Sequence, residues 1–332
     1  MKLPITLEDN LLAVARYYAR DAKAQCIDVS EMAFPLGHHI PSEEMLSSVS
    51  TRLRAVVQAI EARIAPAADT ADSHGPASWD MLSRSGFLKE PVLIDFMLAR
   101  FAEGRLEVKI AQADDVIVTE QLPALCLKNS DLPIAEAAQA LLASETLNRR
   151  SHKNLYRELP PENLHQLVWR VVAALQILSG AKNEAHIANA KILLDEQDEA
   201  QSRRAAARKL ALFIPREYQP QMLIPQKAGL PLFIAKLASD TGLDHDHILR
   251  LIDGHSSIPL AMMLRYAGVN RDSAMAVICL FKGFDLTPHE VNIFDSGYEA
   301  ADMEAVEAEL SVWAQQRSRF LAFPGALQDD DA

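Results

Sequence analysis

Hydrophobic residues recur three and four positions apart along most of the chain. Residues 41–64 and 161–178 carry this pattern most clearly, and residues 7–24 also show it. The apolar positions are Met45, Val49, Leu53, Val56, Val57 and Ile60 in the first stretch, and Leu164, Leu167, Val168, Val171, Val172 and Leu175 in the second. Such spacing places apolar side chains on one face of an α-helix. It predicts amphipathic helices, with Ser42 as one N-cap and Pro161 opening another.

The periodicity is interrupted where Pro, Gly, Asp and Ser gather. The sequence PAADTADSHGPAS at residues 66–78 has no helical spacing and is typical of a flexible connection. A chain of 332 residues also exceeds the usual single-domain length of roughly 100–200 residues. The predicted division is an N-terminal helical unit at 1–65, a linker at 66–78, a HEAT-like helical region at 79–215, C-terminal helical hairpin repeats at 216–322 and an acidic tail at 323–332.

The middle of the chain predicts a helical hairpin. The stretch VIVTEQLPALCLKNSDLPIAEAAQALLASETL has a polar turn at residues 129–131 and places Pro133 in the first turn of the following helix. This layout is typical of a degenerate HEAT repeat. β-branched runs are scarce, and LEVKI at residues 106–110 is the one candidate strand. We therefore predict an all-α protein of stacked antiparallel helix hairpins, a HEAT-like and helix-turn-helix-like repeat array.

Residues 234–254, IAKLASDTGLDHDHILRLIDG, have the spacing of a helix-turn-helix. In such a unit a small residue lies where two helices cross, a glycine takes the turn, and apolar residues of the second helix close the contact. Ala238, Gly242, Ile248 and Leu251 meet these demands. Asp244 is a natural N-cap for the second helix, a contribution of about 1 kcal/mol.

A shift of 26 positions repeats this unit. It places Gly242 on Gly268, and Asp244 and Asp246 on Asn270 and Asp272. A repeated hairpin is explained by stacking, because each copy buries its apolar stripe on its neighbour. The repeat therefore favours a packing role over DNA recognition.

Charge and composition narrow the range of partners. The net charge is −12, and residues 285–332 hold eleven Asp or Glu against Arg317 and Arg319, a local balance of −9. This balance disfavours nucleic acid and anionic membranes. The longest apolar run, residues 274–281, is far shorter than the roughly 20 residues that cross a bilayer. Because MKLPITLEDN has no apolar signal region, and three separated cysteines form no disulfide framework, we expect a cytoplasmic protein.

The second helix of the helix-turn-helix unit opens with Asp244, His245, Asp246 and His247, followed by Arg250. Residues early in a DNA-recognition helix approach phosphates, which two carboxylates would repel. The same residues invite a metal hypothesis, but His245 and His247 lie about 160° apart on a helix at roughly 100° per residue. Asp246 falls opposite the apolar stripe, and we expect it to face water.

Other candidate chemistry is sparse. The chain has no G-x-x-x-x-G-K-[ST], G-x-G-x-x-G, G-x-S-x-G or C-x-x-C motif, so we expect no catalytic, cofactor-binding or metal-binding residues. The basic residues Arg203, Arg204, Arg208 and Lys209 could bind an acidic partner, although cations near a helix end also complement its dipole.

Three segments carry a family resemblance. They are SSVSTRLRAVVQAIEARI, LPPENLHQLVWRVVAAL and LPLFIAKLASDTGLDHDHILRLIDGHSSIPLAMMLRYAGVNRDSAMAVICLF. In these the chain resembles the alphaproteobacterial domain-of-unknown-function family 2336. The resemblance implies an all-helical bacterial protein and carries over no catalytic residue.

These observations favour a non-enzymatic helical-repeat scaffold or regulatory adaptor that binds another protein, with the acidic C-terminal helix at the interface. One alternative is a DNA-binding regulator that uses the helix-turn-helix at 234–254. A third is an HD-like metal-dependent hydrolase with His245 and Asp246 as paired ligands.

Overall fold

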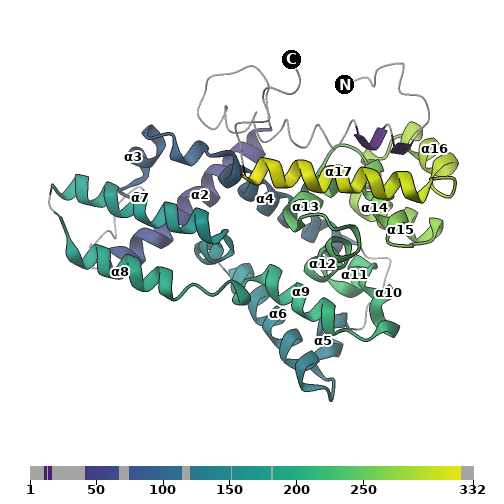
Figure 1. The fold of residues 1–332 in the computed structure, drawn as a ribbon, viewed down its shortest axis with the longest axis horizontal. Coiled ribbons are helices and arrows are strands. Elements are labelled where there is room, and N and C mark those ends of the chain that lie inside the picture. Colours follow the sequence, from purple (N-terminus) through teal and green to yellow (C-terminus); the bar gives the residue numbers. More distant parts are fainter. Residues whose placement is uncertain are drawn as a thin grey trace. The chain divides into compact units, whose positions relative to one another are not determined.

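The computed structural model describes residues 11–12, 14–16, 42–66, 75–113, 120–150, 152–180 and 182–322. Within these ranges every regular element is a helix and none is a strand, which confirms the all-α prediction (Figure 1). The acidic tail at 323–332 and most of the linker at 66–78 fall outside the described residues. None of the described helices combines the length and apolar character needed to cross a membrane.

The prediction of a candidate strand at residues 106–110 was wrong. These residues lie inside a long helix, α4 (Pro91–Gln112), and Leu106 is buried there. LEVKI alternates in polarity over only five positions. This run is too short for its strand pattern to prevail over the helical pattern of the residues before it.

The α-helices follow in chain order. They are α2 (Glu43–Ile64), α3 (Trp79–Arg84), α4 (Pro91–Gln112), α5 (Leu122–Leu127), α6 (Leu132–Arg150), α7 (Pro161–Ser179), α8 (Glu184–Asp195), α9 (Arg203–Phe213), α10 (Gln219–Met222), α11 (Pro225–Ala228), α12 (Leu230–Thr241), α13 (His245–Asp253), α14 (Ile258–Tyr266), α15 (Arg271–Lys282), α16 (Pro288–Gly297) and α17 (Met303–Ala322). Short 3-10 helices join them: η1 (Phe87–Lys89), η2 (His152–Glu158), η3 (Glu199–Gln201), η4 (Arg216–Tyr218) and η5 (Gly283–Asp285).

The helices form two compact units, each assembled from separate segments. Unit 1 comprises the described residues of 1–27, 98–138 and 207–332. Unit 2 comprises those of 28–97 and 139–206. The predicted segments 1–65 and 79–215 therefore each contribute residues to both units.

Unit 2 is built around α2. This helix packs against α7, α8 and η2, and its buried residues are Val49, Leu53, Val56, Val57, Ile60 and Ile64. Ser42 caps its start as predicted, since the Ser42 side chain accepts from the Met45 backbone N–H at 3.2 Å. Helix α7 begins at Pro161 and ends at Ser179, and its C-cap Gly180 has a left-handed φ of 64° that suits glycine. The predicted apolar faces of both helices are thus the buried ones.

Unit 1 contains the two related hairpins, α12–α13 and α14–α15. Gly242 and Gly268 take the left-handed turn after the first helix of each hairpin, with φ of 69° and 77°. Asp244 and Asn270 cap the second helix of each hairpin through their side chains. Helix α14 packs against α12, α13, α15 and α17, so the hairpins bury their apolar stripes on one another.

Helix α17 completes unit 1 with one buried face. Val306, Leu310, Trp313 and Phe320 are buried, and the indole Nε1 of Trp313 donates to Glu309 Oε1 at 2.8 Å. Exposed acidic residues on α17 are confined to its first two turns, at Glu304 and Glu307. The predicted acidic helix is therefore also a structural part of unit 1.

Candidate functional site

The α12–α13 hairpin has the predicted helix-turn-helix geometry. Helix α12 ends at Thr241 with Gly242 as its C-cap, and Asp244 Oδ1 accepts from the backbone N–H groups of Asp246 and His247 at 3.1 and 3.2 Å. Ile248 and Leu251 are buried, as the motif requires. The turn chemistry that the sequence predicted is therefore present.

The second helix of this hairpin lacks an open face. His245, Asp246 and Arg250 are buried and His247 is half-buried. Arg317 of α17 lies over the start of the helix, where its Nη2 contacts Asp244 Oδ1 at 3.3 Å. A recognition helix must enter a major groove with its leading residues exposed. The surroundings of α13 do not provide that exposure.

Asp246 does not face water, contrary to the sequence expectation. Its exposed fraction is 4%, and its Oδ1 forms an ion pair with Nη2 of Arg100 on α4. Arg100 also pairs with Glu103 Oε2 at 2.7 Å, and His245 Nδ1 lies 3.4 Å from Asp246 Oδ1. The prediction failed because helical periodicity identifies only the apolar stripe, whereas α4 supplies ionic partners to the polar side of α13.

The same ion pair opposes a metal role for His245 and Asp246. A guanidinium group already pairs with Asp246 Oδ1, and its positive charge would repel a metal ion bound beside it. Over the described ranges no group of three or more His, Cys, Asp or Glu side chains is placed to hold a metal ion. The Glu103–Arg100–Asp246–His245 chain is instead a buried ionic network between two helices.

A second cluster of charge surrounds the ends of α13 and α15. Lys282 Nζ donates to the carbonyl of Gly254, and Lys109 Nζ donates to that of Phe281. Arg105 Nη1 lies 3.5 Å from Asp253 Oδ2. Three cations thus gather where two helices end, which the negative ends of the helix dipoles favour. Sequence reasoning missed this cluster because its members come from two distant segments.

Burial shifts the acid–base behaviour of this cluster. Removal from water lowers the pKa of Lys282 to about 8, although Asp253 opposes the change. Burial also raises the pKa of Asp253, against the attraction of Arg105 and Lys282. Both shifts disfavour the charged forms, as desolvation of partly compensated charges does.

The basic residues predicted as an interaction site do not form one exposed patch. Arg203 is buried, and its backbone N–H donates to Glu158 Oε1 at 2.7 Å. Arg204 is half-buried, whereas Arg208 and Lys209 are exposed. The first two belong to unit 2 and the last two to unit 1. Only the second pair is openly available to a partner.

Three exposed leucines lie on α5 and at the first residue of α6, within unit 1. The exposed fractions are 43% for Leu125, 44% for Leu127 and 70% for Leu132. We call these three residues the leucine surface. The hairpin buries a different set of residues, namely Leu122, Cys126, Ile134, Ala137 and Ala138. The leucine surface was missed because a helix of six residues is too short for periodicity to separate its inner and outer faces.

No protein-family model matches this chain, and comparisons with curated proteins and with solved structures also found no match. The resemblance to the domain-of-unknown-function family 2336 therefore stays a prediction.

Proposed function

We propose that this chain is a non-enzymatic helical adaptor of the cytoplasm that binds another protein through the leucine surface. The observation that carries the proposal is that Leu125, Leu127 and Leu132 lie within eight positions of sequence and are each more than 40% exposed. Single exposed apolar residues are ordinary on protein surfaces, whereas several on one short stretch of chain favour an interaction site.

The chemistry of the leucine surface favours an apolar partner with a polar rim. Burying one leucine side chain contributes about 1.5–3 kcal/mol, so a few anchors suffice for specific binding. Lys128 lies between Leu127 and Leu132 and pairs with Glu120 at 2.6 Å. The expected partner therefore presents an apolar face, bordered by groups that can meet an exposed ion pair.

The DNA-binding alternative has less support. Its helix-turn-helix offers the partner a largely buried helix, with carboxylates at its start. The HD-like hydrolase alternative depends on His245 and Asp246, and Arg100 already holds the Asp246 carboxylate. Neither alternative has an observation as direct as the exposed leucines.

A crosslinking experiment tests the proposal. A photoreactive amino acid replaces Lys128 in the full chain. This variant is incubated with native cell extract and irradiated, and mass spectrometry then identifies the crosslinked protein. The affinity of that purified protein is then measured by calorimetry. Replacing all three leucines of the surface with serine should weaken it roughly tenfold or more, because each lost apolar contact costs at least about 1.5 kcal/mol.

The control variant replaces Ile177 and Leu178, an exposed apolar pair on α7 of unit 2, with serine. It should bind as the unaltered chain does. Equal affinity for the leucine variant and the unaltered chain would contradict the proposal. A crosslink formed only with a second copy of the chain would also contradict it, since that result indicates self-association.

A further inference from the structure

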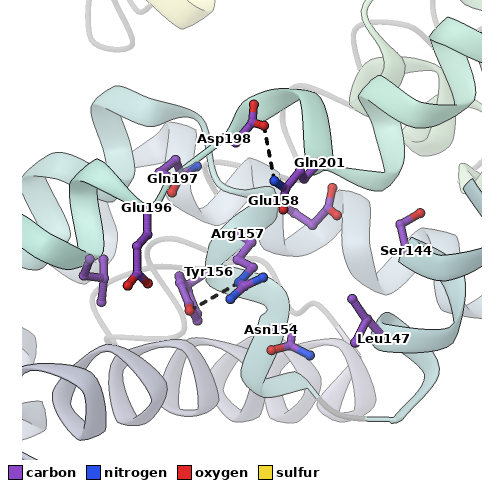
Figure 2. A pocket seen from close by; sticks show the side chains of 11 residues that line it. Ser144, Leu147, Asn154, Tyr156, Arg157, Glu158, Glu196, Gln197, Asp198 and Gln201 are labelled. Carbon is purple, nitrogen blue, oxygen red and sulfur yellow. Dashed lines mark hydrogen bonds between the residues drawn. The ribbon is translucent and has the colours of Figure 1, made fainter. Parts of the chain in front are cut away.

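Unit 2 contains a small polar pocket that the proposed function does not use. Its volume is about 60 Å³, and it is lined by residues of α6 and η2 and by the chain from the end of α8 to η3 (Figure 2). Drug-sized ligands occupy roughly 300–1,000 Å³. One water molecule takes roughly 30 Å³. The pocket therefore suits a ligand of a few heavy atoms.

The pocket is lined by one cationic side chain, Arg157, which is exposed to solvent. Within the described ranges, the hydrogen bond of the Arg157 side chain runs from Nε to the neighbouring Tyr156 hydroxyl at a long 3.4 Å. The guanidinium carbon lies 5.9 Å from the Tyr156 ring centre, which helps to orient the group. The two terminal nitrogens have no carboxylate partner among the described residues. A guanidinium fork of this kind matches a carboxylate by two parallel hydrogen bonds.

The pocket also offers one carboxylate oxygen. Glu158 is 9% exposed, and its Oε1 is occupied by the backbone N–H of Arg203 at the start of α9. This oxygen therefore lies at the positive end of the α9 dipole. Glu158 Oε2 has no hydrogen-bond partner among the described residues and remains available to a ligand donor.

The other two carboxylates of the pocket are engaged in part or in full. Glu196 forms an ion pair with Arg63. Asp198 Oδ1 accepts from the backbone N–H of Ala200 at 2.9 Å, and its Oδ2 accepts from Gln201 Nε2 at 3.3 Å. In Figure 2 Arg157 lies between Glu196 on one side and Glu158 on the other. Glu196 Oε1 has no partner among the described residues, but its side chain is 53% exposed, so the buried carboxylate oxygen available beside the guanidinium is Glu158 Oε2.

We propose that this pocket binds a small amino carboxylate, a molecule with one carboxylate and one ammonium group. The ligand carboxylate pairs with the terminal nitrogens of Arg157, and the ligand ammonium donates to Glu158 Oε2. Leu147 and Leu193 supply apolar wall for a short side chain. A simple anion would meet the Glu158 carboxylate without compensation, and a simple cation would meet Arg157, so one molecule with both charges fits better than either.

Calorimetry on the full chain tests this assignment with glycine, L-alanine and L-serine as probes. Acetate and methylamine carry the same charges singly and serve as comparison ligands. At least one amino acid should bind saturably, and roughly tenfold or more tighter than either comparison ligand. Acetate or methylamine binding as tightly as the amino acids would overturn the proposal. So would the lack of saturable binding for all three amino acids up to roughly 10 mM.

Two variants address the residues directly. Arg157→Gln removes the fork, and Glu158→Gln removes the charge while keeping an acceptor for the Arg203 backbone N–H. Each should weaken amino-acid binding roughly tenfold or more, because each removes a charge-assisted contact. Arg208→Gln, an exposed position in unit 1, is the matched control and should bind as the unaltered chain does.

A folding defect in Glu158→Gln would not obscure the result, because Leu147→Trp provides a separate test. Leu147 is half exposed at the pocket, and a larger ring there fills the space without removing a buried contact. Amino-acid binding that survives both Arg157→Gln and Leu147→Trp would place the ligand elsewhere and overturn the assignment. These readouts are independent of the leucine surface, which lies in the other unit.

Discussion

Lys282 lies at the end of α15 with 6% of its surface exposed, so its ammonium group is largely removed from water. The Gly254 carbonyl and the Asp253 carboxylate compensate only part of that loss, and the pKa of Lys282 falls to about 8. Below that pH the folded chain holds a buried charge, which costs stability. Above it, the folded chain holds a neutral amine.

This residue gives unit 1 a stability that rises with pH. The folded pKa of about 8 lies below the unfolded value of 10.5, so between these values the unfolded chain binds more protons. The free energy of unfolding should therefore increase by about 2 kcal/mol between pH 7 and pH 9.5, from this group alone. Urea denaturation across that range measures it, in comparison with Lys282→Met, which has no amine to titrate.

The comparison with Lys282→Met removes the titrating amine while the other groups of unit 1 with shifted pKa values remain. The pKa of Asp253 is raised from 3.8, so any cost of its ionised form is relieved as pH falls through that raised pKa. The pKa of Tyr298 is raised above its ordinary value of 10.0, which affects stability at the alkaline end. Both groups are present in the variant and the unaltered chain. Parallel stability curves for the two would contradict the role given to Lys282.

Asp246 and Asp272 occupy equivalent positions in the two related hairpins, but their surroundings differ. Asp246 is buried against Arg100, whereas Asp272 is exposed at the start of α15. Replacing Asp246 by alanine leaves a buried guanidinium with one carboxylate fewer, which should cost about 3 kcal/mol or more. Asp272→Ala should change stability by no more than about 0.5 kcal/mol. Urea denaturation of both variants checks the pair, and similar losses in the two would contradict the buried network.

The residues whose roles are local could be predicted from sequence. Ser42 and Asp244 act as N-caps, and Gly242 takes the left-handed turn, because each role depends on a few neighbouring backbone groups. The orientation of Asp246 could not be predicted. Its partner Arg100 lies 146 positions away on another helix, and a single sequence carries no signal of that contact.

At the scale of elements, the geometry of a hairpin does not determine whether it can bind a partner. The α12–α13 hairpin has the turn and the packing of a helix-turn-helix, yet its second helix is covered on its polar side by α4 and at its start by α17. The α5–α6 hairpin has no such motif but presents exposed leucines. A helix-turn-helix motif thus defines how two helices pack against each other. Whether their side chains can reach a partner depends on the helices that surround them.

Long helices and short helices also differ in how well the sequence predicts their faces. Helices α2 and α7 span several turns, so their apolar stripes are unambiguous and prove to be buried. Helix α5 has one and a half turns, and its leucines divide between the inside and the outside. The leucine surface and the pocket beside η2 both depend on such short elements, which explains why neither was predicted.

At the scale of the whole molecule, each compact unit draws on segments that are far apart in sequence. In unit 2, α2 packs against α7, α8 and η2, although residues 98–138, which belong to unit 1, lie between them in the sequence. A prediction that divides the chain into consecutive segments cannot describe that arrangement. Amino-acid composition indicates where linkers lie but carries no signal of contacts between distant segments. The predicted HEAT-like region at 79–215 accordingly contains α7 and α8 but lacks α2.

This arrangement predicts how fragments of the chain behave. A fragment of residues 79–215 lacks the six buried apolar residues of α2, so α7 and α8 lose the helix that covers them. We expect this fragment to lose helicity gradually in urea, without a cooperative transition. A fragment of residues 42–215 restores α2 and should unfold cooperatively. Both fragments lack the same parts of unit 1, so the difference between them isolates α2. Circular dichroism during urea titration measures it, and two equally sharp transitions would mean that α7, α8 and η2 pack without α2.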